Sequence, residues 1–139
     1  MYKKILVTLD GTKTDRAIID HAKPLAKLAR SHVVLLHVAD GWAARTYGAD
    51  AVSREISDDT AYLKKVLAEF RSAGISADAE LAYGDPVTEI VKWVQQKGCD
   101  LVAMSTHGHR FIGDFFLGTT ASRVQHSISV PVLLLRAKK

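Results

Sequence analysis

A stretch of small, polar and cationic residues near the C-terminal end of the chain could bind an anion. Ser105-Thr106-His107-Gly108 is followed by nine residues and then by Gly118-Thr119-Thr120. A short apolar run, Leu101 to Met104, precedes the stretch, and a helical pattern, Thr119 to Ile128, follows it. Glycines let a backbone approach a phosphate, and the free N–H groups and dipole of a helix N-terminus favour negative charge. The pattern predicts an anion-binding loop between a strand and a helix.

Other chemistries fit these residues less well. The glycine spacing differs from both the dinucleotide fingerprint and the P-loop. His107 and His109 lack the cysteine or carboxylate partners of a metal site. No nucleophile-elbow pattern surrounds Ser105, and Asp10 stands alone after the first apolar run, where a phosphoacceptor domain would need an acidic pair. We therefore expect no catalytic residue and no metal held by protein ligands alone.

Alternating patterns along the chain predict an α/β fold. Apolar runs predict five strands, at Ile5–Leu9, His32–Val38, Ser76–Tyr83, Asp100–Met104 and Val130–Leu135. Helical periodicity predicts helices at Thr14–Arg30, Ser53–Ala73, Pro86–Lys97 and Thr119–Ile128, with Gly41–Val52 as a surface loop. Apolar strands alternating with amphipathic helices indicate a parallel sheet covered on both faces. We expect a three-layer α/β sandwich with a five-stranded parallel sheet of order 3-2-1-4-5.

Several residues have expected roles within these elements. Thr14 or Asp15 is expected to cap the first helix, and Asp85, before Pro86, to cap the third. Ile56 is expected on the core side of the second helix, with Asp59 on its outer side. The weakly alternating third strand suits a sheet edge.

The predicted topology brings two distant segments together. In open parallel sheets, ligands bind beyond the carboxyl ends of the strands, where the strand order reverses. Here the reversal falls between the first and fourth strands, which places Thr8 to Asp10 beside Met104 to Gly108. This convergence predicts that the glycine-spaced loop is part of a ligand site.

Composition limits the remaining possibilities. The chain has 139 residues and a formal net charge of +4 with dispersed lysines and arginines, which favours one domain, 1–139, without a nucleic-acid surface. No segment is apolar and long enough to span a membrane, and the N-terminus has no signal-peptide pattern, so we expect a cytoplasmic protein without membrane insertion. The single cysteine, Cys99, is expected to be a buried structural thiol.

Four motifs are spread over the whole chain: Tyr-Lys-Lys-Ile-Leu-Val at the start, Val-Val-Leu-Leu-His-Val in the second strand, Gly-Asp-Pro before the third helix, and Ser-Thr-His-Gly…Leu-Gly-Thr…Val-Pro-Val-Leu-Leu-Leu at the end. Together they resemble the universal stress protein family of the ATP-binding type. The family loop is G-x2-G-x9-G-[ST]; Ser105 replaces its first glycine, and Asp114 stands where many relatives carry a basic residue. The resemblance implies an adenine nucleotide alpha hydrolase-like, Rossmann-like fold.

The resemblance also implies a site for ATP, ADP or AMP, with Mg²⁺. Asp10 would accept hydrogen bonds from the ribose hydroxyls, the backbone of Val38 would meet the adenine edge, and Gly108, Gly118 and Thr119 would contact phosphates. The complete expected nucleotide-binding set is Thr8, Leu9, Asp10, Val38, Met104, Ser105, His107, Gly108, His109, Gly118, Thr119 and Thr120.

The expected function is a stress response regulated by nucleotide binding. The family resemblance implies a homodimer that pairs the apolar last strand, Val130–Leu135, with its copy, and we also expect an unidentified protein partner. Any ATP hydrolysis would be slow, because the sequence offers no clear general base. The alternative is a protein-interaction and dimerisation module whose nucleotide pocket is vestigial.

Overall fold

Five parallel strands and four helices make up the described part of the chain. The computed structural model describes residues 1–39, 49–105 and 120–136, with the backbone alone for 49–55. In chain order the elements are β1 (Lys4–Leu9), α1 (Asp15–Ala29), β2 (His32–Ala39), α3 (Ala49–Ser72), β3 (Ala77–Tyr83), α4 (Pro86–Lys97), β4 (Leu101–Ser105), a helix over 120–127, and β5 (Val132–Leu135).

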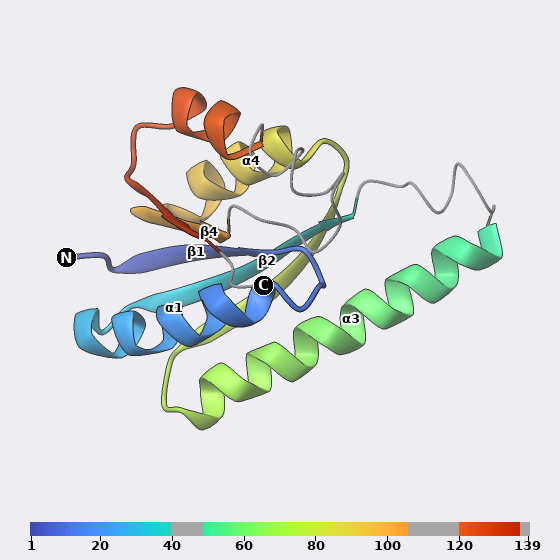
Figure 1. The fold of residues 1–139 in the computed structure, drawn as a ribbon, viewed down its shortest axis with the longest axis horizontal. Coiled ribbons are helices and arrows are strands. Elements are labelled where there is room, and N and C mark those ends of the chain that lie inside the picture. The colour runs from blue at the N-terminus through green and yellow to red at the C-terminus, as the bar shows by residue number, and fades with distance from the viewer. Residues whose placement is uncertain (40–48, 106–119, 137–139) are drawn as a thin grey trace.

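The sheet has the order β3-β2-β1-β4-β5, and every pairing in it is parallel. Helices α1 and α3 cover one face, whereas α4 and the helix of residues 120–127 cover the other (Figure 1). The predicted three-layer sandwich and its 3-2-1-4-5 order are confirmed. As expected, β3 lies at an edge of the sheet, where it pairs with β2.

Alternating side chains of the strands divide the core into two layers. Ile5 and Val7 of β1 face α1 and α3, where Phe70 is the largest fully buried side chain. Leu6 faces the opposite side, toward Val94 of α4 and the helix of residues 120–127. Because β1 is apolar on both faces and flanked by β2 and β4, it is a rigid base for the loop that follows it.

The ends of some elements differ from the sequence-based expectation. Helix α3 begins at Ala49, so residues 49–52, which we expected in a loop, are helical. Alanine has the highest helix propensity, and Ala49 and Ala51 favour this extension. The last strand begins at Val132 rather than Val130. Pro131 has no N–H to donate, although its carbonyl accepts a hydrogen bond from Val102 N at 3.0 Å.

Side-chain expectations within the helices are met in part. Asp85 caps α4 by accepting a hydrogen bond from Thr88 N at 3.0 Å, as expected. The expectation for Ile56 was wrong, since it is 37% exposed on α3.

Cys99 is buried, as expected, and burial raises the pKa of its thiol to about 11. Among the described helices, none has the length and apolar character needed to cross a bilayer.

Candidate functional site

The described part of the expected site lies where β1, β2 and β4 end. Leu9 pairs with His37 across β1 and β2, so Asp10 and Val38 are the next positions along the two strands. On the other side Val7 pairs with Ala103, which brings Thr8 next to the level of Met104. The strand register therefore brings residues from three separate segments together at the carboxyl ends of the strands, where the strand order reverses.

The expected residues of the glycine-spaced loop divide between described and undescribed segments. Ser105 ends β4 and is 6% exposed, and its Oγ has no hydrogen-bond partner among the described residues. Thr120 is the first described residue of the helix that ends at residue 127. The five other loop residues of the expected set lie outside the described residues: His107, Gly108, His109, Gly118 and Thr119. The same holds for Asp114.

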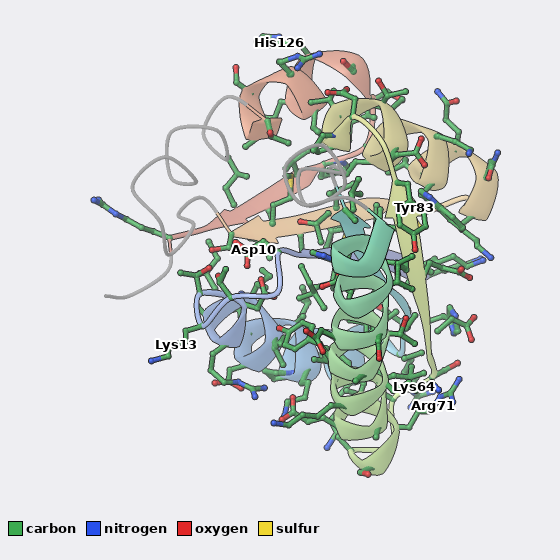
Figure 2. All side chains as sticks on the ribbon, turned by 90° about the vertical axis from the view of Figure 1, so that its right-hand side faces the viewer. Asp10, Lys13, Lys64, Arg71, Tyr83 and His126 are labelled. Carbon is green, nitrogen blue, oxygen red and sulfur yellow. The ribbon has the colours of Figure 1, made fainter. Side chains whose placement is uncertain are left out.

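Asp10 begins the tight turn that leads from β1 to α1. Its Oδ1 accepts hydrogen bonds from Thr12 N at 2.8 Å and Thr12 Oγ1 at 2.6 Å. Thr14 Oγ1 donates a longer bond, of 3.4 Å, to Oδ2. Figure 2 shows Asp10 at the end of β1, above the start of α1, and Lys13 extends outward from the turn between the two elements. The carboxylate is thus held at a fixed place by its own turn, with Oδ2 less engaged than Oδ1.

The side chain of Asp15 also stabilises the turn that contains Asp10 and Gly11. It is 2% exposed, and its Oδ2 accepts hydrogen bonds from Gly11 N at 2.8 Å and Asp10 N at 3.1 Å. Asp10 N also lies 3.0 Å from Oδ1 of Asp15. We expected Thr14 or Asp15 to cap α1; Thr14 is the N-cap residue but makes no side-chain cap bond. Asp15 instead turns back to the loop, so its role as a helix cap was predicted wrongly.

Tyr62 connects α3 to this buried carboxyl group. Its hydroxyl donates a 2.6 Å hydrogen bond to Asp15 Oδ2. Burial and then the neighbouring charge of Asp10 raise the pKa of Asp15 from 3.8 to about 7, against the lowering effect of the Tyr62 bond. Burial and the contact with Asp15 raise the pKa of Tyr62 as well, so its phenol remains protonated as a donor. A titratable group with a pKa near neutrality therefore lies directly beneath Asp10.

His37 and Asp59 form a second polar contact next to the turn. His37 Nδ1 lies 2.9 Å from the carbonyl oxygen of Leu9, and since a carbonyl can only accept, Nδ1 carries the proton. Nε2 of the same ring lies 3.3 Å from Asp59 Oδ2, but the two atoms form no hydrogen bond, and Asp59 Oδ2 has no hydrogen-bond partner among the described residues. We expected Asp59 on the outer side of its helix, but its carboxylate turns inward and lies beside this histidine. His37 is therefore hydrogen-bonded to the end of β1 and lies against α3 independently of Tyr62.

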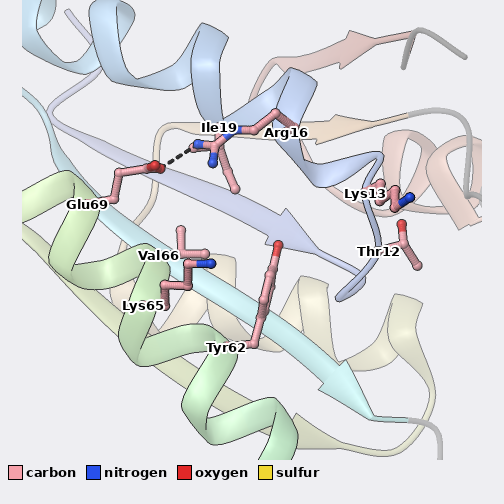
Figure 3. A pocket seen from close by; sticks show the side chains of 8 residues that line it. All are labelled: Thr12, Lys13, Arg16, Ile19, Tyr62, Lys65, Val66 and Glu69. Atoms are coloured by element: carbon pink, nitrogen blue, oxygen red, sulfur yellow. Dashed lines mark hydrogen bonds and ion pairs between the residues drawn. The ribbon is translucent and has the colours of Figure 1, made fainter.

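A cleft between α1 and α3 opens beside these contacts (Figure 3). Its volume is about 150 Å³, below the roughly 300 Å³ at which small-molecule sites usually begin. Arg16 and Glu69 face each other across it in an ion pair, and the hydrogen bond from Arg16 lowers the pKa of Glu69. Tyr62 forms part of its wall. The cleft is too small for a nucleotide. The candidate site is therefore the region next to it where β1, β2 and β4 end.

Comparison with known proteins identifies the family. The universal stress protein family profile matches residues 1–136, which is nearly the whole chain. The chain belongs to the universal stress protein family. The resemblance of its motifs is thereby confirmed, and the shared fold agrees with the observed sheet order.

Individual members of the universal stress protein family align over full length. MJ0577 of Methanocaldococcus jannaschii is 26% identical, and the alignment covers 99% of this chain and 97% of that protein. Its solved structure superposes with a TM-score of 0.89 and covers 100% and 99% of the two chains. A universal stress protein solved in complex with cAMP gives 0.72 at 19% identity, covering 99% and 98%. One from Archaeoglobus fulgidus, in complex with dAMP, gives 0.71 at 18%, covering 96% and 97%.

Sequence reasoning missed the contacts of four polar residues beneath the candidate site of this universal stress protein, namely Asp15, Tyr62, His37 and Asp59. Asp15 was expected to cap α1 and Asp59 to lie on the outer side of α3, and the patterns around Tyr62 and His37 gave neither residue a role. Asp15 carried one signal, since it follows Asp10 by five residues at the start of a helix. Nothing in the sequence indicates that Tyr62, which is 47 positions further along, reaches Asp15.

Proposed function

We propose that the chain binds ATP, or the related nucleotides ADP and AMP, together with Mg²⁺ where β1, β2 and β4 end. The observation that carries the proposal is the placement of Asp10, fixed by Thr12 and Asp15, at the point where the strand order reverses. An ionised carboxylate there suits the two hydroxyl donors of a ribose. Structures of similar fold in complex with cAMP and dAMP support an adenine nucleotide as the ligand class.

In this proposal the remaining expected residues complete the pocket. Val38 and Met104 flank the base, and the segment from Ser105 to Thr120 surrounds the phosphates. Ser105 Oγ is buried and has no hydrogen-bond partner among the described residues, so a ligand oxygen would be a suitable partner for it. The N-terminus of the helix of residues 120–127 would favour the negative charge of the phosphates. Mg²⁺ would be held by the phosphates, because among the described residues no cluster of three acidic, histidine or cysteine side chains is found.

Calorimetry tests the nucleotide proposal directly. Nucleotide-free protein is titrated with ATP, ADP, AMP and cyclic AMP, with and without Mg²⁺. We expect saturable binding of at least one of them at a single site per chain. A flat titration with all four at millimolar concentration would refute nucleotide binding and leave only the interaction module described next.

We further propose that the protein acts in the cytoplasm as one domain, 1–139, which pairs through its last strand. β5 lies at the sheet edge beside β4, and Leu134 on it is 37% exposed. Because an apolar edge strand is prone to pair with another strand, a two-fold contact through Val130–Leu135 is the expected partner surface. Nucleotide-dependent association with a further protein would then link binding to the stress response. Sedimentation equilibrium should give twice the chain mass, and a monomer at all concentrations would exclude this dimer.

A further inference from the structure

The turn that contains Asp10 is held in place by the carboxyl group of Asp15. Asp15 accepts hydrogen bonds from the backbone N–H groups of both Asp10 and Gly11, and the Tyr62 hydroxyl donates to the same carboxyl oxygen that receives Gly11 N. Direct hydrogen bonds of Tyr62 and Asp15 therefore connect α3 to Asp10. A change in the protonation of Asp15 acts on Asp10 through the hydrogen bond to its backbone N–H group.

We propose that Asp15 and Tyr62 are positioning residues that orient Asp10 toward the ribose hydroxyls of the ligand, and that protonation of Asp15 weakens ribose recognition. The inference rests on the proposed function, since it concerns the same site. It goes further by assigning a role to two residues that would not touch the ligand.

The two protonation states of Asp15 hold the turn differently. An ionised carboxylate is acceptor-only and makes charge-assisted bonds to both backbone N–H groups, about twice as strong as neutral ones. A protonated carboxyl group has weaker acceptors and a hydroxyl to donate. Protonation thus weakens the bonds that hold the backbone of Asp10 and Gly11 and loosens the turn from which the Asp10 carboxylate extends.

Several other ionisable groups surround Asp15, and the experiment must separate them. Asp10 faces it from the turn and Tyr62 from α3. Arg16 is the next residue on α1 and acts on Tyr62. The His37–Asp59 pair also lies close, with His37 near Gly11. The pH dependence is therefore assigned to Asp15 only if it disappears when Asp15 alone is changed.

The test compares two ligands that differ only at the ribose. The dissociation constants of ATP and 2′,3′-dideoxy-ATP are measured with Mg²⁺ on the nucleotide-free full chain at pH 6 and pH 8. Their ratio isolates ribose recognition, because effects of pH on the phosphates, the base or the fold act on both ligands. The variants are Asp15→Asn and Tyr62→Phe. Asp20→Asn, exposed on the same helix, and Tyr2→Phe, at the opposite end of the sheet, are the matched controls.

The wild type should prefer ATP by about tenfold or more at pH 8, the scale of hydrogen bonds to a charged group, and by several-fold less at pH 6. Asp15→Asn keeps an acceptor for the backbone N–H groups but carries no charge, so it resembles the protonated state. It should show the weaker preference at both pH values. Tyr62→Phe removes a bond that favours the ionised form, so the loss of preference should move to higher pH. Both controls should match the wild type.

Three outcomes would overturn the inference. A wild-type preference that is equal at pH 6 and pH 8 would show that protonation does not reach the ribose site. A pH-dependent preference that persists in Asp15→Asn would assign the effect to another group, with His37 the first candidate. An unshifted pH profile in Tyr62→Phe would exclude its positioning role. All three leave nucleotide binding intact, whereas a wild type that binds neither ligand would refute the proposed function together with the inference.

Discussion

Replacing Asp15 with asparagine is expected to stabilise the protein more at pH 8 than at pH 5. The pKa of Asp15 is raised from 3.8 to about 7 in the folded chain, so between these values the folded state binds more protons than the unfolded state. Stability from this group is therefore fully present below about pH 4 and is lost as the pH rises to about 7. Between pH 5 and pH 8 the wild type should lose roughly 2.5 kcal/mol of unfolding free energy through Asp15, since one pKa unit is worth about 1.4 kcal/mol.

Urea unfolding at pH 5, 6, 7 and 8 measures this effect as the difference between the variant and the wild type. Asparagine cannot ionise, so the difference should grow by the same roughly 2.5 kcal/mol in favour of the variant across this range. Asp20→Asn, on the exposed side of α1, should follow the wild type within about 0.5 kcal/mol at every pH. A difference between Asp15→Asn and the wild type that stays constant with pH would mean that Asp15 is ionised throughout.

The cost of keeping Asp15 indicates that it serves the site rather than the fold. A buried carboxyl group beside another carboxylate destabilises the folded protein at neutral pH, whereas an uncharged residue of similar size would not. Groups with strongly raised pKa values gather at functional sites for this reason. Two of its bonding partners are the backbone N–H groups of Asp10 and Gly11, and the third is the Tyr62 hydroxyl. A stability gain together with a loss of ribose recognition in one variant would be the expected trade-off.

The sheet order could be predicted from the sequence because strand and helix patterns alternate along the whole chain. Each apolar run except the last is followed by an amphipathic helix, and right-handed crossovers then leave few arrangements of five parallel strands. Local signals with one physical cause were also reliable: Asp85 caps α4 as its position before Pro86 predicts. The start of α3 was missed because Gly41 and Gly48 suggested a loop up to Val52, whereas the alanines after Gly48 favour a helix.

The chemistry beneath the site was much harder to predict. Asp15 at the start of α1 has the residue type and position of an N-cap, and local propensity alone could not distinguish a cap from a carboxyl group that turns back to the preceding loop. Its partner Tyr62 and the His37–Asp59 pair depend on how α3 packs against the end of β1, which is a tertiary contact. The position of Asp10 at the end of β1 could be predicted from the topology, whereas Val38 was named from the family resemblance.

Gly118→Val is expected to abolish ATP binding while the protein stays folded. In the proposed site Gly118 is where the backbone approaches the phosphates, and a valine adds a branched side chain at that place. Loss of two hydrogen bonds to charged phosphate oxygens, each worth about 1.5–3 kcal/mol, would weaken binding by about 100-fold or more. The helix of residues 120–127 would lose access to the phosphates at the same time.

Calorimetry with ATP and with adenosine separates this effect from damage elsewhere in the pocket. Adenosine has the base and ribose but no phosphate, so its affinity should be equal in Gly118→Val and the wild type. Gly118→Ala, with a single added methyl group, should retain weakened ATP binding, and circular dichroism with thermal unfolding should report a native fold for both variants. If Gly118→Val binds ATP with unchanged affinity, the loop from Ser105 to Thr120 does not hold the phosphates. If it loses adenosine as well, the base and ribose site at Asp10 and Val38 is not independent of that loop.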